Sequence, residues 1–560
     1  MVSSSRRGGG PARGRTARGR TARGRPIRGR PIRGRPAAAA LTAGLATLLA
    51  VSACTSPSSA ASSAPATTSA SAPAATGAPN SAGPIIPTAS TLRWHACTGE
   101  LALLRVPDCT TLSVPLNYAD PRGRHISLAL DMIPATAPRS RQQGILLVNP
   151  GGPGGSGLSL AVAVAQGLAP AVTADYDIVG FDPRGVGSSV PALSCDPGFF
   201  SGARPNYIPA NPAAEQAQIS LARLYADDCE QKFGWLLPYM TTEDSARDLD
   251  SIRAAFGVSK INYYAFSYGT YLGQVYATLF PARVRRMVLD STVDPTGVWY
   301  TDNVNQDYAF DKRQDAFYAW MARYDRAYHL GRTAASVRAA YYRARNRLAA
   351  DPVNGQFGPD ELDDTVLVGG YDDGLWPGLA QALSVYVNYG LSASLIAQYQ
   401  AHGLQGENGF AVYHAVECSD VNWPRSWAYW TSDTEMVYRT APFEAWPNAW
   451  FNAACAFWPV RGPAKPLQIR GAGLPGILML QGTLDAATPY AGAQDAHKLL
   501  PSARMVVVTG SGNHGQSLDN PPDACVQDYL NAYLATGALP HAPGLVNATC
   551  PAVPVPTLGP

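Results

Sequence analysis

The chain has few of the motifs that mark metal and nucleotide sites. Its nine cysteines form no Cys-x-x-Cys pair, and no His/Cys spacing suits a metal ion. The glycine-rich segment at residues 149–157 has no Gly-Lys-[Ser/Thr], and its one Gly-x-Gly-x-x-Gly spacing, at Gly152, Gly154 and Gly157, is by itself a weak signal for phosphate binding. We therefore expect no metal and no cofactor.

Acidic residues are missing from the N-terminal 54 residues. Residues 1–36 contain 12 arginines, and residues 37–54 contain no charged residue. The remainder of the chain has 32 basic residues against 41 acidic ones, which gives a net charge of −9. A folded part with this charge is not expected to bind nucleic acid.

The N-terminus has the features of an export signal. Residues 1–53 combine the arginine-rich stretch with an apolar run that ends in small residues, which is typical of a signal peptide. The sequence Val-Ser-Ala-Cys ending at Cys54 resembles a bacterial lipobox, which would anchor the chain by a lipid on the outer face of the cell membrane. Cleavage elsewhere, for example after Ala60, would instead give a secreted protein. Residues 54–91 are rich in Ser, Ala, Thr and Pro, and are predicted to be a disordered tether.

Eight cysteines remain when Cys54 is set aside. An even number in an exported chain predicts disulfides. The sequence does not fix their connectivity, and the simplest arrangement pairs neighbours: Cys97–Cys109, Cys195–Cys229, Cys418–Cys455 and Cys525–Cys550. Each would close a short loop and stabilise the fold by about 3–4 kcal/mol.

The sequence around Ser267 predicts a strand, a tight turn and a helix. Residues 261–266 are apolar and aromatic, as in a buried strand, and a helical pattern follows as far as Pro281. The turn matches the nucleophile elbow, although Ala265 stands where the motif has glycine. We predict that Ser267 is a nucleophile and that the helix N-terminus favours developing negative charge.

Strands alternate with helical segments on both sides of this elbow. Paired strands are predicted within residues 94–136, and the segment at 190–242 reads as an irregular excursion. Further buried strands are predicted at residues 144–148, 176–181, 285–290, 477–481 and 504–509. This order predicts an α/β fold with a mostly parallel, doubly wound sheet.

The alternation stops between residues 296 and 470, where the sequence is helical and aromatic. This segment follows a strand at the edge where the elbow emerges. We therefore predict a core of residues 92–295 and 471–560, split by a mainly helical lid of residues 296–470 that covers the site.

A serine hydroxyl needs a base to take its proton, and the base needs a group to orient it. Asp485 and His514 each follow a predicted strand, so both should lie at the same sheet edge as Ser267. We predict His514 as the base and Asp485 as the orienting acid. Asp290 also ends a strand and is the alternative acid.

The glycine-rich loop at residues 149–157 follows a buried strand. Its bare backbone can donate N–H groups to an oxyanion. We predict that Gly151 and Gly152 supply one donor and that the N–H of Tyr268 is the other.

Five motifs together resemble the tripeptidyl aminopeptidase branch of the α/β-hydrolase peptidases, which is related to the proline iminopeptidases. They lie at residues 149–157, 180–185, 266–270, 482–489 and 512–515. The resemblance spans about residues 92–552, including the C-terminal segment from Cys525 to Cys550. It implies an α/β-hydrolase fold and an exported serine exopeptidase that releases short peptides, often tripeptides, from free N-termini. Pro150 replaces the histidine of the iminopeptidase loop, which argues against strict prolyl specificity.

An aminopeptidase must bind an ammonium group, and a carboxylate in the lid would do so. Glu417 and Asp420 are the candidates, because a disulfide at Cys418 would fix them rigidly; equally, they could only brace the lid. The expected partners are oligopeptides, and the chain is expected to act as a monomer. A carboxylester hydrolase with the same triad is the alternative function.

Overall fold

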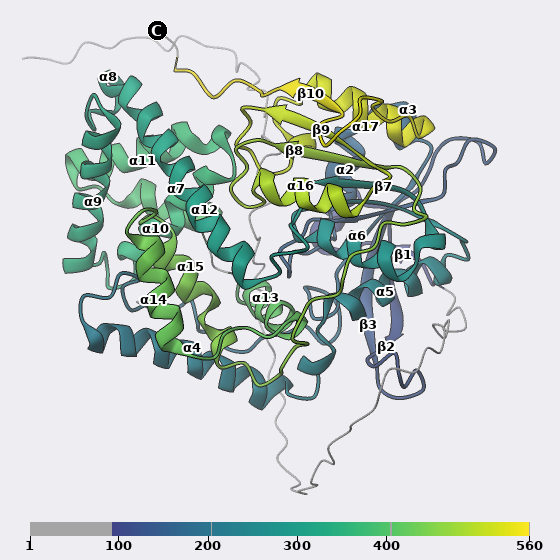
Figure 1. Ribbon diagram of the computed structural model, residues 1–560, viewed down its shortest axis with the longest axis horizontal. Helices are drawn as coiled ribbons and strands as arrows, with labels where there is room; N and C mark the ends of the chain where they lie inside the picture. Colours follow the sequence, from purple (N-terminus) through teal and green to yellow (C-terminus); the bar gives the residue numbers. More distant parts are fainter. Residues whose placement is uncertain (1–91, 203, 404–405, 559–560) are drawn as a thin grey trace, which may run out of the picture. The chain divides into compact units, whose positions relative to one another are not determined.

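The computed structural model describes residues 92–202, 204–403 and 406–558 (Figure 1). The predicted signal peptide, Cys54 and the tether lie outside these residues. Within the described ranges, none of the helices has the length and apolar character needed to span a lipid bilayer.

The fold is built around one ten-stranded sheet with the order β1-β2-β3-β5-β4-β6-β7-β8-β9-β10. Strands β1 to β3 and β5 pair antiparallel, and all other neighbours pair parallel. The antiparallel strands are β1 (His95–Ala96), β2 (Asp108–Pro115) and β3 (His125–Ile133). The parallel strands are β4 (Ile145–Asn149), β5 (Asp177–Phe181), β6 (Ile261–Phe266), β7 (Val284–Asp290), β8 (Ile477–Gly482), β9 (Ala503–Thr509) and β10 (Ala548–Pro551). The predicted, mostly parallel α/β sheet is confirmed.

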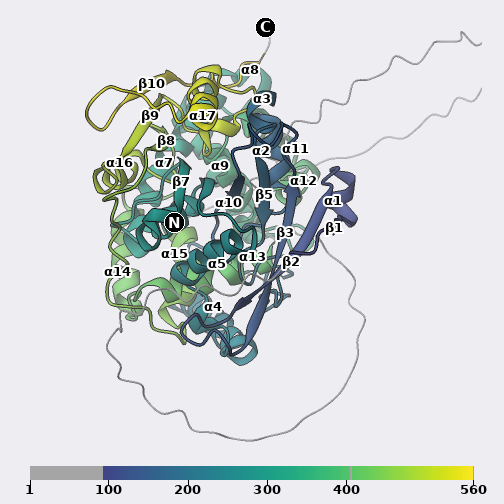
Figure 2. The ribbon, with the colours of Figure 1, turned by 90° about the vertical axis from the view of Figure 1, so that its right-hand side faces the viewer.

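Helices cover both faces of the sheet because its central strands are apolar on both sides. Leu146 and Val148 of β4 pack with one layer, whereas Leu147 faces the other. The first layer contains α2 (Leu160–Gly167), α3 (Pro170–Thr173) and α17 (Ala524–Thr536), and the second contains α5 (Thr242–Ala255), α6 (Tyr268–Leu279) and α16 (Tyr490–Leu499). Figure 2 shows β1 to β3 at one end of the sheet and β9 and β10 at the other.

A helical insertion separates β7 from β8, as the sequence predicts. We call residues 296–470 the lid. Many of its buried side chains form a hydrophobic cluster of their own, to which α7, α9 and α11 contribute. Its helices are α7 (Tyr300–Arg323), α8 (Asp325–Tyr328), α9 (Ala334–Ala350), α10 (Pro359–Leu367), α11 (Trp376–Tyr389), α12 (Ala393–His402), α13 (Glu407–Asp420), α14 (Trp427–Tyr438) and α15 (Ala445–Asn452) (Figure 1).

The expectation of an irregular excursion at residues 190–242 is wrong. This segment contains α4 (Pro212–Phe233), a helix of 22 residues. The Asn211 side chain accepts the N–H groups of Ala213 and Ala214, and Pro212 occupies the first turn, where its missing N–H costs nothing. Ala222 of α4 packs in one cluster with Trp446 and Trp450 of the lid, so this second insertion joins the lid.

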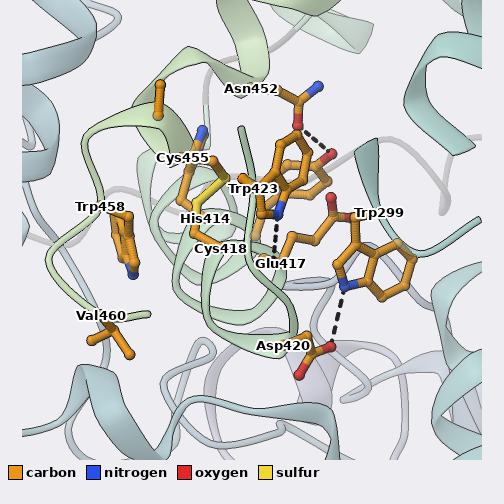
Figure 3. The surroundings of a disulfide bond; sticks show 12 residues. Trp299, His414, Glu417, Cys418, Asp420, Trp423, Asn452, Cys455, Trp458 and Val460 are labelled. Carbon is orange, nitrogen blue, oxygen red and sulfur yellow. Dashed lines mark hydrogen bonds between the residues drawn. A yellow bond between two sulfur atoms is a disulfide. The ribbon is translucent and has the colours of Figure 1, made fainter. Parts of the chain in front are cut away.

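The four predicted disulfides are confirmed. The pairs Cys97–Cys109, Cys195–Cys229, Cys418–Cys455 and Cys525–Cys550 join neighbours along the chain, 12 to 37 residues apart. The third links α13 to the short helix η6 (Ala453–Ala456) within the lid (Figure 3). The fourth links α17 to β10.

Candidate active site

Ser267 sits in the turn between β6 and α6 with φ 56° and ψ −132°. A positive φ is uncommon for a residue with a side chain, and such strain is concentrated at functional turns. The turn is possible because its neighbours are small. A Cβ added to Gly269 would lie only 3.0 Å from the Cβ of Ala265. The missing side chain at Gly269 therefore leaves room for alanine at the first position of the elbow.

His514 is bound to Asp485. The Nδ1 atom lies 3.0 and 3.1 Å from the two carboxylate oxygens, and both residues are buried. Thr488 holds the carboxylate through its backbone N–H at 3.1 Å and its hydroxyl at 2.9 Å. Because the carboxylate accepts, Nδ1 carries the proton and Nε2 is left as the basic nitrogen. Burial by itself would lower the pKa of His514, but the charge and hydrogen bond of Asp485 outweigh it and raise the pKa.

Asp290 has a different environment from Asp485. Its carboxylate accepts the backbone N–H groups of Gln516 and Ser517, both at 2.9 Å, and the Ser517 hydroxyl. Burial raises the pKa of Asp290 to about 6 despite these bonds. Of the two acids that the sequence allows, Asp485 is the one bonded to the imidazole, and Asp290 holds the backbone that follows His514.

The segment Asp290–Ser291 links the serine turn to the histidine loop. The Ser267 N–H donates to the carbonyl oxygen of Asp290 at 3.1 Å. On the other side, the Gly515 N–H donates to the Ser291 hydroxyl at 2.8 Å. Backbone hydrogen bonds to two successive residues thus connect the turn that carries Ser267 with the loop that carries His514.

The glycine-rich loop lies directly against the elbow. A Cβ added to Gly151, where φ is +97°, would lie 2.8 Å from Ser267 Cβ and 3.0 Å from the nitrogen of Tyr268. The Gly151 N–H donates to the Asn149 side chain at 3.0 Å, so this donor is already occupied. Gly152 and Tyr268 remain as candidate oxyanion donors. Tyr268 begins α6, and the N–H groups of a first helical turn have no partner within the helix.

Asp420 is engaged at the junction between lid and core. It accepts the backbone N–H of Thr242 at 2.7 Å and the Thr242 hydroxyl at 2.5 Å. It also accepts the Trp299 indole N–H at 3.2 Å (Figure 3). The Thr242 hydroxyl also lies 2.8 Å from the phenol oxygen of Tyr268. Burial raises the pKa of Asp420 to about 7. This carboxylate ties the end of α13 to the start of α5.

Glu417 is more deeply buried than Asp420, with 3 % of its surface exposed, and it has fewer donors. The Asn303 amide donates to it at 3.3 Å, and a hydrogen bond with Tyr413 adds to this. Burial raises its pKa well above the ordinary value. Among the described residues, no Arg or Lys opposes that rise, so Glu417 is a buried acid with no cation beside it in this part of the chain.

Glu444 is a further acid that sequence reasoning missed. It precedes α15, is 7 % exposed, and its carboxylate makes no hydrogen bond or ion pair with another described residue. Burial and the carboxylates of Asp307, Asp364 and Asp363 raise its pKa well above the ordinary value. The sequence feature that could have indicated Glu444 is its place as a single acid between Phe443 and Trp446, in a largely apolar stretch.

An elbow serine, a glycine-rich loop beside it and a carboxylate-bound imidazole at the edge of a parallel sheet define a serine hydrolase with the α/β-hydrolase fold. Comparison with known proteins agrees, since a family model described as alpha/beta hydrolase fold matches residues 144–521.

Named relatives cover most of the chain. The tripeptidyl aminopeptidase of Streptomyces lividans is 44% identical over 456 residues, which are 79% of this chain and 84% of that one. The serine protease Hip1 of Mycobacterium tuberculosis is 32% identical over 483 residues, 80% of this chain and 89% of that one. Carboxylesterase B of Mycobacterium tuberculosis is 31% identical over 467 residues, with shares of 80% and 88%. The chain belongs to the tripeptidyl aminopeptidase family of α/β hydrolases, and the resemblance found in its motifs is confirmed.

Proposed function

We propose that this protein is a serine exopeptidase that releases short peptides, chiefly tripeptides, from the free N-termini of oligopeptides. The observation that carries the proposal is the Asp290–Ser291 segment, which bonds the turn of Ser267 on one side and the loop of the Asp485-bound His514 on the other. The name and 44% identity of the Streptomyces lividans relative support the peptide class.

In the proposed reaction, Ser267 Oγ attacks the scissile carbonyl carbon while Nε2 of His514 takes its proton. Asp485 stabilises the imidazolium that forms. The N–H groups of Gly152 and Tyr268 bind the negative oxygen of the tetrahedral intermediate. His514 then gives the proton to the leaving amine, and water hydrolyses the acyl-enzyme by the same steps.

We propose that the substrate ammonium group is bound by Glu417 together with Glu444. A buried carboxylate without a cation is costly, and an incoming ammonium group would compensate that cost. Asp420 already accepts three hydrogen bonds from Thr242 and Trp299, so its role is to anchor the lid. Of the two acids that the sequence indicated, Glu417 is retained.

We propose that the enzyme acts outside the cell as a monomer, with residues 92–295 and 471–560 as its core and residues 296–470 as its lid. Four disulfides fit an oxidising compartment. A lipid on Cys54 would hold the enzyme at the outer face of the membrane, with residues 55–91 as the tether.

The test uses the mature chain and chromogenic amides of mono-, di- and tripeptides, each with a free amine and as an acetylated copy. Release from tripeptides that acetylation abolishes is the expected result. Glu417→Gln and Glu444→Gln should each raise KM for free-amine substrates and leave the turnover of a small aryl ester unaffected. Ser267→Ala should lower kcat by about 10⁶-fold. A fall of only a few-fold would remove Ser267 from the mechanism.

Carboxylester hydrolysis is the second candidate, because one relative of 31% identity is named carboxylesterase B. Turnover of simple aryl esters without any peptide cleavage would favour it. The fold and the triad would then stand, but the lid acids would have another role.

A further inference from the structure

The loop that carries His514 is held by the lid as well as by the core. The His514 backbone N–H donates to the carbonyl oxygen of Tyr371 at 2.8 Å. The N–H of Asp373 donates to the Asn513 side chain at 2.9 Å. The Tyr371 ring also meets the imidazole edge to face, with 5.6 Å between ring centroids. Two successive residues of the histidine loop therefore have partners in the lid turn at residues 370–373.

That turn is fixed to α7 by Arg313. The guanidinium forms an ion pair with Asp373, and its Nε reaches the carbonyl oxygen of Gly370 at 3.5 Å. It also lies over the ring of Trp376, 5.2 Å from the centroid. With 5 % of its surface exposed, Arg313 is a structural cation inside the lid.

Arg313 also touches the histidine loop itself. A Cβ added to Gly512 would lie 2.2 Å from Cζ of Arg313 and 2.3 Å from one of its terminal nitrogens. The guanidinium thus packs against bare backbone two residues before His514. Close approach of the lid arginine explains why this position of the loop is glycine.

We propose that Arg313 is a positioning residue for His514, acting through Asp373 and the lid turn at residues 370–373. The inference rests on the proposed role of His514 as the base, and it does not depend on which substrate is cleaved. The lid holds one side of the histidine loop, and Asp290 and Ser291 hold the other. Without the arginine, the lid no longer holds its side of the histidine loop, and His514 can shift. A displacement of about 1 Å at a catalytic group lowers the rate on the order of 10²-fold.

The proposal separates two functions of a lid. A lid that only binds substrate contributes to KM for peptides and is irrelevant to a small ester that does not fill it. A lid that positions the base is needed for every substrate. Arg313 should therefore affect kcat for large and small substrates alike.

The test is Arg313→Met in the mature chain, measured on a small aryl ester and on a free-amine tripeptide anilide. We expect kcat to fall about 10²-fold on both, with KM within twofold of the parent. The rate of covalent labelling by a fluorophosphonate should fall in parallel, because labelling also needs the base. Arg313→Lys restores a cation beside Asp373 and should recover part of the loss.

Arg345→Met is the matched control. Arg345 is also a lid arginine, 3 % exposed, and its ion pair with Asp363 at 2.8 Å resembles that of Arg313. Its hydrogen bonds and ion pairs with described residues go to Asp363, Asp360 and Asn206, and none goes to the histidine loop. We expect it to lower Tm and leave kcat unchanged. If Arg313→Met also changes only Tm, the residue is merely structural. If it raises KM for the peptide and spares the ester, it binds substrate, and either result overturns the proposal.

Asn513→Ala keeps the test decisive if Arg313→Met does not fold. It removes the acceptor of the Asp373 N–H, together with the amide that donates to Asp519 at 2.9 Å, at a half-buried position. It should lower kcat on both substrates by about tenfold. Unchanged kcat in this variant would overturn the proposal. Failure of the proposed peptidase function would appear differently, because the parent enzyme would then not cleave the peptide. Ester turnover by the parent enzyme and by Arg313→Met would still test the role of Arg313.

Discussion

Replacing Asp485 with asparagine should lower kcat strongly while the fold is preserved. The carboxylate faces three donors: the imidazole Nδ1–H, the Thr488 backbone N–H and the Thr488 hydroxyl. Asparagine offers one acceptor oxygen, and its amide nitrogen would be repelled by the backbone N–H. The amide nitrogen should therefore face the hydroxyl, which can rotate to accept, and point a proton at Nδ1 of His514.

That arrangement favours the wrong tautomer of His514. A proton on Nε2 leaves no basic nitrogen for Ser267, and the charge that stabilised the imidazolium is gone. We expect kcat to fall about 10⁴-fold, which corresponds to about 5.5 kcal/mol in the barrier. The assay is steady-state turnover of a tripeptide anilide, with thermal unfolding by circular dichroism to verify the fold.

Asp290→Asn is the comparison that can refute this reasoning. Its carboxylate accepts two backbone N–H groups and one hydroxyl, so the amide would leave a backbone donor unsatisfied. We expect a loss of about 1–3 kcal/mol in unfolding free energy and less than a tenfold change in kcat. A 10⁴-fold loss in Asp290→Asn, with near-normal turnover in Asp485→Asn, would reverse the assignment of the acid.

Three further predictions address pH, the elbow contact and the lid disulfide. The pKa of His514 is raised above 6.5, and only the neutral imidazole is a base. As the pH is lowered, kcat/KM should therefore fall with a midpoint above pH 6.5. A midpoint below pH 6.5 in the pH–rate profile would contradict the contact with Asp485. Gly151→Ala should lower kcat at least about 10²-fold, because the new Cβ would lie 2.6 Å from the Phe266 carbonyl oxygen. Gly144→Ala is the control: φ is positive there too, at +87°, but the nearest atom to the new Cβ is the Asn262 side-chain nitrogen at 4.0 Å. It should cost about 1 kcal/mol of stability without changing kcat. Replacing Cys418 and Cys455 by serine should lower the free energy of unfolding, measured in urea, by about 4 kcal/mol. This is roughly 1 kcal/mol more than for the same change at Cys97 and Cys109, because the two disulfides close loops of 37 and 12 residues. A larger loss at Cys97 and Cys109 would argue against an origin in loop entropy.

The sheet and the acid–imidazole pair could be predicted because they depend on local patterns. A buried parallel strand is a continuous apolar run, and polar residues just beyond such runs must gather at one edge. Asp485 and His514 follow β8 and β9 in this way, and they meet as expected.

The lid contacts could not be predicted, because they depend on packing between segments distant in sequence. Arg313 and Gly512 are separated by the whole remainder of the lid, and nothing near either residue indicates their contact. Pairing of Asp420 with Thr242 has the same origin, and it turns a suspected binding group into an anchor. Helix α4, by contrast, was predictable from the Asn211-Pro212 start, but its sparse apolar pattern concealed it.

The C-terminal strand β10 protects the sheet from other molecules. The last strand of a sheet presents unpaired N–H and C=O groups to which a second chain can add. Residues Ala548 to Pro551 pair with Val506 to Thr509 and so cover the apolar strand β9. Pro551 lacks an N–H for further pairing, and the bond between Cys525 and Cys550 keeps the covering strand attached to α17. These four residues therefore occupy the edge of β9 to which a strand of a second chain could otherwise add.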